Sequence, residues 1–121
     1  VTIVATGHLV WEALQAAETL NEQGISAEVI NIHTIKPLDD EAILNSISKT
    51  RCIVTAEEHN FLGGLGESVA RVLGNNNPTP QEFVATQDTF GESGTPEQLM
   101  EKYGLNASAI CKAALKVIDR K

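Results

Sequence analysis

The stretch TAEEHNFLGGLGESVA at residues 55–70 decides the fold, because it runs from a strand pattern through a glycine-rich loop into a helix pattern. The segment CIVTA at 52–56 is short, apolar and rich in β-branched residues, as buried strands are. After the glycines, apolar residues recur on one helix face, at Leu65, Val69, Val72 and Leu73. The stretch is therefore a strand, loop and helix unit of the kind that builds α/β folds.

The same unit occurs on both sides of this stretch. Further strand patterns lie at residues 1–5, 27–32 and 83–86. Strands and helices alternate, the crossovers are long enough for parallel pairing, and the strands are continuously apolar, as in a sheet covered on both faces. We therefore expect an α/β protein, a three-layer α/β/α sandwich with a mainly parallel, Rossmann-like sheet and one domain over residues 1–121.

Turn and capping residues mark the helix ends. The first helix pattern ends at Gly24, the second begins at Asp39 or Asp40, and the last begins at Asn106. A short helix is also expected over residues 95–104. The positions expected to face the core are Val10, Ala13, Leu14, Ala17 and Leu20 in the first helix, Ala42, Ile43 and Ile47 in the second, and Ile110, Ala114, Val117 and Ile118 in the last.

Composition narrows the function classes. The net charge of −7 leaves no clustered positive field for nucleic acid or an anionic membrane, and no apolar run reaches the roughly 20 residues of a spanning helix. Cys52 and Cys111 fit no metal or redox spacing, so buried, reduced thiols are expected. We expect a cytoplasmic protein that binds neither nucleic acid nor membrane. Its start at Val1, inside an apolar strand pattern, indicates a fragment or a processed chain.

Polar residues follow the expected strands. His8, His33 and His59 follow the first three strands, and Asp88 follows the fourth. Carboxyl ends of parallel strands meet at one edge of a sheet, where ligands bind in open α/β folds, so these side chains should share that edge. The edge either binds a ligand or subunit, or its polar side chains satisfy loop carbonyls. A three-histidine metal site is not favoured, because no companion ligand spacing supports it.

Glu57 and Glu58 open the loop after the third strand. Adjacent residues of an extended chain point to opposite faces, so these carboxylates do not form an acid and base pair on one substrate. One of them could accept hydrogen bonds from loop amides, or lie near His59 and raise its pKa.

The glycines Gly63, Gly64 and Gly66 raise the question of phosphate binding, because such loops before helices often hold phosphate. This loop lacks the lysine of a P-loop, and three glutamates that would repel an anion lie near it, at Glu57, Glu58 and Glu67. We interpret the glycines as structural, allowing a tight turn and close backbone approach.

The segment GESG at residues 91–94 does not have the GxSxG spacing of a nucleophile elbow. No histidine is placed in the sequence to activate Ser93, so no nucleophile is predicted. Trp11 is expected to be a packing or interface residue rather than a ligand platform.

Four blocks of the sequence resemble the C-terminal domain of transketolase, especially of split or short bacterial and archaeal transketolases. They are VATGHLVWEALQAAETL (4–20), INIHTIKPLDDEAI (30–43), VTAEEHNFLGGLGESVA (54–70) and DTFGESGTPEQLMEKYGL (88–105), and they cover nearly the whole chain. In that family an N-terminal domain holds the diphosphate of thiamine diphosphate and its metal, a middle domain holds the aminopyrimidine, and the C-terminal domain helps to build the dimer.

The resemblance implies a parent enzyme that transfers two-carbon ketol units between sugar phosphates, as in the pentose phosphate pathway, with thiamine diphosphate and Mg²⁺. This chain would lack the N-terminal and pyrimidine-binding domains. It should bind no cofactor and be inactive alone. The family's GDG and NN cofactor motif has no match, because Gly74-Asn75-Asn76 lacks the upstream aspartate and glycine.

The implied partners are the cofactor-binding domains or subunit of the same enzyme and a second copy in a homodimer. Two alternatives stay open: a freestanding module that binds a small anion or a protein at the histidine-bearing edge, and the equivalent domain of deoxyxylulose-phosphate synthase or of a 2-oxoacid dehydrogenase β subunit. The interface or strand-edge candidates are His8, His33, Glu57, Glu58, His59, Asn60, Gly63, Gly64, Gly66, Asp88, Glu92 and Ser93.

Overall fold

The computed structural model describes residues 1–7, 9–32, 39–57, 64–85 and 106–121. Strands and helices alternate along these segments as the sequence predicts. The elements are β1 (Thr2–Ala5), α1 (Leu9–Glu22), β2 (Glu28–Asn31), α2 (Asp40–Thr50), β3 (Ile53–Ala56), α3 (Leu65–Asn76), β4 (Gln81–Val84) and α5 (Ala107–Asp119).

The strands form one parallel sheet in the order β2-β1-β3-β4. Thr2 at the start of β1 pairs with Glu28 of β2 and with Ile53 of β3, and Ile53 pairs in turn with Gln81 of β4. The chain therefore adds β2 on one side of β1 and then β3 and β4 on the other. This reversal between β1 and β3 is where doubly wound folds open a crevice at the carboxyl ends of their strands.

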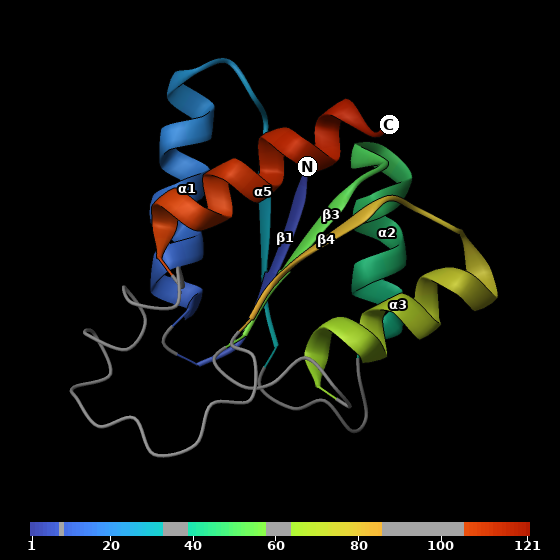
Figure 1. Ribbon diagram of the computed structural model, residues 1–121. Coiled ribbons are helices and arrows are strands. Elements are labelled where there is room, and N and C mark those ends of the chain that lie inside the picture. The colour runs from blue at the N-terminus through green and yellow to red at the C-terminus, as the bar shows by residue number, and fades with distance from the viewer. Residues whose placement is uncertain (8, 33–38, 58–63, 86–105) are drawn as a thin grey trace.

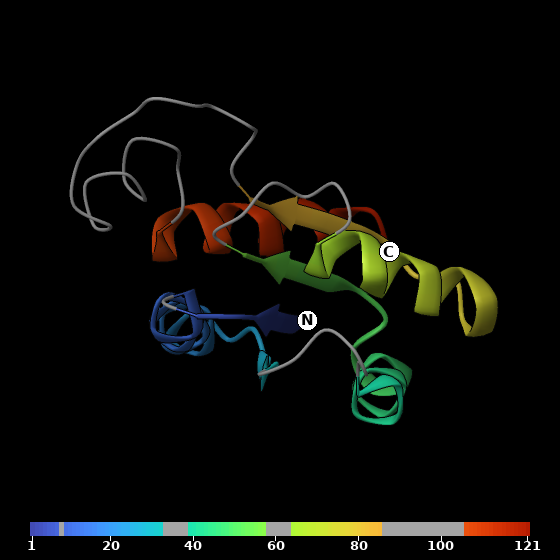
Figure 2. The same ribbon diagram turned by 90° about the horizontal axis from the view of Figure 1, so that it is seen from below.

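Helices cover both faces of the sheet. Figure 1 shows α1 and α5 on one face and α2 and α3 on the other, and Figure 2 shows the same layers from below. The change of direction in strand order coincides with the change of face, as a uniform crossover hand requires. The three-layer α/β/α sandwich with a parallel sheet is confirmed.

Each face of the sheet has its own apolar core, because neighbouring residues of a strand point to opposite sides. Ile3 and Ala5 belong to the core under α1 and α5, whereas Val4 belongs to the core under α2 and α3. The central strands β1 and β3 are buried along their whole length, and the edge strands β2 and β4 are only partly buried. Within the described residues, no helix has both the length and the apolar character of a membrane span.

The predicted helix ends are confirmed in detail. Asp39 caps α2, with its Oδ1 accepting from the Ala42 amide at 3.1 Å, and Asn106 caps α5 in the same way through the Ala109 amide at 2.9 Å. Gly24 has a φ of 81°, and the chain turns there to leave α1.

Three sequence predictions were wrong. Leu14 is 50% exposed instead of facing the core, because it lies outside the buried stripe of α1, which consists of Leu9, Ala13, Ala16, Ala17 and Leu20. The fourth strand begins at Gln81 and ends at Val84, two residues earlier than predicted, because pairing to β3 and not apolar character sets its register. Cys52 is buried as expected, whereas Cys111 is only half-buried, and both are free thiols. The short helix predicted over residues 95–104 lies outside the described residues.

Candidate functional site

The site begins with one buried carboxylate. Glu57, the residue after β3, is 3% exposed, and its Oε1 and Oε2 accept hydrogen bonds from the amides of Leu65 at 2.9 Å and Gly66 at 2.7 Å. These amides open α3, where a helix has unpaired N–H groups and partial positive charge. Both oxygens of the carboxylate are therefore used to hold the start of α3.

The residue that would normally cap α3 cannot do so. Gly64 occupies the N-cap position and has no side chain with which to accept a hydrogen bond. Glu57 supplies the missing acceptors from the end of β3, and its own amide donates to the Val84 carbonyl of β4 at 2.9 Å. The sequence allowed two roles for a carboxylate here, and acceptance from backbone amides is the one the hydrogen bonds confirm.

Gly66 is required for close packing rather than for an unusual backbone conformation. A Cβ at this position would lie 2.6 Å from Cε2 of Phe83 and 3.0 Å from Oγ1 of Thr55, so the helix approaches β3 and β4 too closely for a side chain. The Gln81 amide nitrogen donates to the Gly66 carbonyl at 2.9 Å and to Thr55 Oγ1 at 3.1 Å. The first turn of α3 is thus fixed from the strand side as well.

Three of the predicted site residues are brought together at the start of α3: Glu57, Gly64 and Gly66. The expected gathering of histidines at the carboxyl edge of the sheet stays a prediction. The other candidates lie outside the described residues, and they are His8, His33, Glu58, His59, Asn60, Gly63, Asp88, Glu92 and Ser93.

This arrangement occupies two of the amides at the start of α3. An anion at the start of α3 would compete with the Glu57 carboxylate, which already occupies the amides of Leu65 and Gly66. In the ranges that the structure describes, no group of three or more histidine, cysteine, aspartate or glutamate residues is placed to hold a metal ion. The described part of the chain therefore does not fit a metal-bridged diphosphate.

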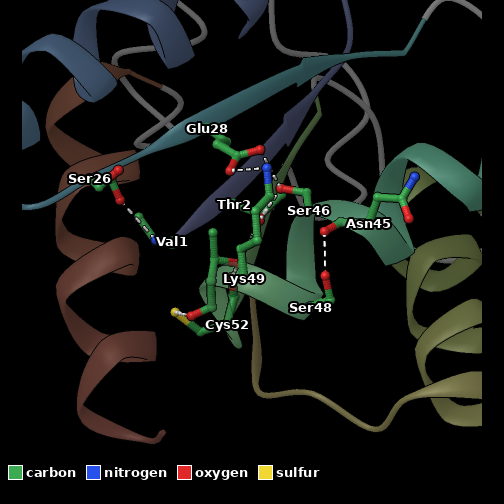
Figure 3. Close-up of polar contacts among 10 residues, drawn as sticks. Val1, Thr2, Ser26, Glu28, Asn45, Ser46, Ser48, Lys49 and Cys52 are labelled. Atoms are coloured by element: carbon green, nitrogen blue, oxygen red, sulfur yellow. Dashed lines mark hydrogen bonds and ion pairs between the residues drawn. The ribbon is translucent and has the colours of Figure 1, made fainter.

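A second polar cluster lies at the opposite, amino-terminal end of the strands (Figure 3). Buried Thr2 of β1 shares hydrogen bonds of 2.6 Å with Ser46 of α2 and with Thr50 at the end of that helix. Ser46 Oγ also donates to Glu28 Oε1 at 3.1 Å, and Glu28 forms a 2.9 Å ion pair with Lys49. This chain of contacts ties β1, β2 and α2 together.

Sequence reasoning missed this amino-terminal cluster. The available signal was a serine at an otherwise apolar, buried position of α2, between Ile43 and Ile47. The cluster also shifts the titration of Glu28: the hydrogen bond from Lys49, and then the one from Ser46, hold the pKa of Glu28 below its ordinary value of 4.5.

An open pocket of about 650 Å³ beside this cluster carries three cations, Lys49, Arg51 and Lys121. Helix C-termini meet there, because Arg51 caps α2, Asn77 caps α3 and Lys121 follows the end of α5. Helix C-termini carry partial negative charge and favour nearby cations. These three side chains are explained by the helix ends and do not call for a bound anion.

A family model described as the C-terminal domain of transketolase matches residues 1–110. The chain belongs to this family. The resemblance found in the sequence is thereby confirmed, and the fold is that of the family domain.

Transketolases made of separate subunits are among its relatives. The 6-deoxy-6-sulfo-D-fructose transketolase subunit SqwH of Clostridium sp. strain MSTE9 is 53% identical over 121 residues, which are 100% of this chain and 38% of that protein. A solved split-gene transketolase, described as an inactive β4 tetramer, superposes with a TM-score of 0.92 at 45% identity, over 98% of this chain and 39% of its own.

The likeness extends to another member of the superfamily. The 1-deoxy-D-xylulose-5-phosphate synthase of Halothermothrix orenii is 36% identical over 123 aligned residues, which cover 100% of this chain and 19% of the synthase. The chain thus spans less than two-fifths of the length of each of these relatives.

Proposed function

We propose that this chain is the non-catalytic C-terminal domain of a transketolase that transfers two-carbon ketol units between sugar phosphates, and that it supports the dimer of that enzyme. The observation that carries the proposal is the Glu57 carboxylate on the Leu65 and Gly66 amides. The glycine-rich start of α3, which could otherwise receive a phosphate, is filled by the domain's own Glu57 side chain. In this proposal the start of α3 anchors the segment between β3 and α3, which contacts another domain or subunit of the parent enzyme.

The parent enzyme would bind thiamine diphosphate and Mg²⁺ in its other domains or in a partner subunit. When bound, the cofactor supplies the electron sink for ketol transfer. The relatives favour a split parent, since they are a transketolase subunit and a split-gene transketolase. The enzyme would act in cytoplasmic carbohydrate metabolism, such as the pentose phosphate pathway. A second candidate substrate is a sulfonated ketose, which the name of the 53% identical relative favours.

The carboxyl edge of the sheet is the proposed contact surface for those neighbours. Glu57 joins the end of β3 to the start of α3, so the intervening segment leaves and returns at one fixed point. That segment carries Glu58, His59 and Asn60, and the polar residues His8, His33, Asp88, Glu92 and Ser93 follow other strands of the same parallel sheet. These residues would make polar contacts with the cofactor-bearing domains and with the second copy.

The test is reconstitution. The cofactor-bearing subunit or domains of the parent are assayed for ketol transfer with thiamine diphosphate and Mg²⁺, with and without this chain, while sedimentation reports the assembly. We expect turnover only in the mixture, together with a complex that contains two copies of this chain. Full activity of the cofactor-bearing part alone, or failure of the parts to associate, would favour the freestanding module instead.

A further inference from the structure

The last strand of the sheet, β4, has an outer edge that faces away from β3, and we call it the β4 edge. In the described part of the chain β4 ends the sheet and pairs with β3 alone. The carbonyls of Pro80 and Val84 accept hydrogen bonds from β3 and from the residue after it, through the amides of Ile53 at 3.1 Å and Glu57 at 2.9 Å. In a parallel ladder the backbone groups of alternate residues point to opposite sides. The backbone carbonyl of Gln81 therefore lies on the β4 edge.

A side chain from the end of α5 occupies this carbonyl. Arg120 is the C-cap residue of α5, and its Nη1 donates a hydrogen bond to the Gln81 carbonyl at 2.8 Å. The same nitrogen forms an ion pair with Oε2 of Glu82, the next residue of β4. The Gln81 carbonyl is an acceptor of the kind that an added strand would use. Here a guanidinium uses it instead.

Glu82 holds this guanidinium at the β4 edge together with a second cation. The Glu82 side chain is 17% exposed, and the Nζ of Lys116 lies 3.4 Å from its Oε1. Lys116 and Arg120 are four residues apart on α5, so both reach the same carboxylate from one side of the helix. Exposed ion pairs of this kind contribute little to stability. Charged side chains over the edge of a sheet do, however, keep other strands from pairing with it.

The residues of β4 are of the kind that pair readily with another strand. Phe83 and Val84 have high strand propensity, and Phe83 is 45% exposed. The edge strand of a second copy is the partner that fits best, because an antiparallel contact between two β4 strands is self-complementary about a twofold axis. Both copies would then use the same backbone groups.

We propose that Arg120 blocks the β4 edge against strand addition, and that the strand it excludes is β4 of a second copy of this chain. The guanidinium occupies the Gln81 carbonyl that an amide of the second copy would need. Pairing of the strands would also remove water from a charged side chain, which is costly. The proposed function does not use the β4 edge, so this inference does not depend on it.

The test measures self-association of the chain by sedimentation equilibrium at physiological salt. Arg120→Ala frees the Gln81 carbonyl. The double variant E82Q/R120A does the same and leaves the net charge at −7, because it removes one negative and one positive charge. We expect both variants to associate at least about tenfold more strongly than the parent chain. The double variant should associate more strongly than Arg120→Ala, because like charges on paired strands repel.

Hydrogen exchange then assigns the association to the β4 edge. The amide of Gln81 lies on the same side of β4 as its carbonyl, so in the associated variants it should exchange at least about tenfold more slowly than in the parent chain. Sedimentation should give a closed dimer, because two β4 edges satisfy each other and leave no further edge of this kind.

Three control variants separate the backbone contact from charge and from stability. Lys116→Ala removes a cation from the same carboxylate but leaves the Arg120 contact with the Gln81 carbonyl in place. Arg120→Lys keeps a cation that can donate to that carbonyl. Ser46→Ala weakens a cluster on α2, so it shows how much association follows from lower stability alone. All three should associate within about threefold of the parent chain.

Four outcomes would overturn the proposal. The first is Arg120→Ala associating no more strongly than the parent chain. The second is Lys116→Ala or Ser46→Ala associating as strongly as Arg120→Ala, which would make charge or stability the cause. The third is association without slower exchange at Gln81, which would place the contact on another surface. The fourth is an open-ended polymer, which would mean that β4 pairs with some other edge.

Discussion

The two ends of the sheet hold their charges in different ways. At the carboxyl end the buried carboxylate of Glu57 accepts hydrogen bonds from two backbone amides and joins β3 to α3. At the amino end the side chain of Glu28 is 40% exposed, and its carboxylate pairs with Lys49 and connects through Ser46 to the hydroxyl of buried Thr2.

At the carboxyl end the polar contacts depend on one buried side chain, whereas at the amino end they are shared among several side chains. A buried charge with only backbone partners leaves unpaired amides if it is removed, and charge-assisted hydrogen bonds of this kind are strong. A surface ion pair backed by hydroxyls loses little when one member is changed, because water and the remaining hydroxyls compensate. The carboxyl end should therefore be sensitive to single substitutions and the amino end tolerant of them.

The largest effect is expected for Glu57→Ala. It leaves the amides of Leu65 and Gly66 without acceptors in a buried place, and we expect the free energy of unfolding to fall by about 2–4 kcal/mol. Urea unfolding measures this change. The control is Glu41→Gln in the first turn of α2, an exposed acid whose removal should cost about 0.3–1 kcal/mol. Equal losses of unfolding free energy in the two variants would contradict the idea that the buried carboxylate contributes more than an exposed one.

The second effect compares two glycines of α3. Gly66→Ala drives a methyl group into the ring of Phe83 and should destabilise the fold by about 1–3 kcal/mol. Gly74→Ala meets nothing within 4 Å and should stabilise the same helix by about 0.5–1 kcal/mol. Thermal or urea unfolding gives the sign of each change. If Gly66→Ala were also stabilising, the close packing of the first turn against β4 would be wrong.

A third substitution, Ser46→Ala, probes the amino end. It removes the hydroxyl between Thr2 and Glu28, while Thr2 keeps its hydrogen bond to Thr50, so we expect a loss of about 0.5–1.5 kcal/mol. The urea midpoint measures it. A loss of stability as large as that of Glu57→Ala would mean that the amino-end cluster also depends on a single side chain.

The smallest effect is a pH dependence at Glu28. Its pKa in the folded chain lies below 4.5, so its stabilisation is present above 4.5 and is lost as the pH falls through the lower, folded-state pKa. Glu28→Gln should lower stability at pH 7 by about 0.5 kcal/mol or less, because the ion pair is exposed. The difference from the parent chain should shrink as the pH falls below 4.5 and vanish once the pH lies below the folded-state pKa, where Glu28 is protonated in both states. Unfolding midpoints measured from pH 7 down into acid decide it, and a difference that grows in acid would contradict the prediction.

Local chemistry made much of the fold predictable. Asp39, Asn106 and Gly24 mark helix ends by themselves, since a side-chain cap or a left-handed turn needs only near neighbours. Parallel pairing followed from the alternation of continuously apolar strands with helices. In the same way, a glutamate directly after a strand and before a glycine-rich helix start was a recognisable acceptor for backbone amides.

What the sequence could not provide depends on contacts between distant residues. The ring of Phe83 meets Gly66 only once β4 is in register with β3. The same register explains why the fourth strand begins at Gln81, earlier than its apolar residues predict. Leu14 has the spacing of a core residue, but which face of α1 is buried depends on how the helix packs on the sheet, and Leu14 lies outside that face. Ser46 required its partners on β1 and β2 to be known before it could be distinguished from an ordinary helix residue.

The claim that Glu57 fills the helix start, and that this domain therefore supports catalysis without holding the cofactor, is tested most directly by titration calorimetry. The chain is titrated with thiamine diphosphate in the presence of Mg²⁺, and the same sample is assayed for ketol transfer. We predict no saturable binding at micromolar cofactor and no turnover. Micromolar affinity or measurable turnover by this chain alone would contradict that claim and would require a complete cofactor site within these 121 residues.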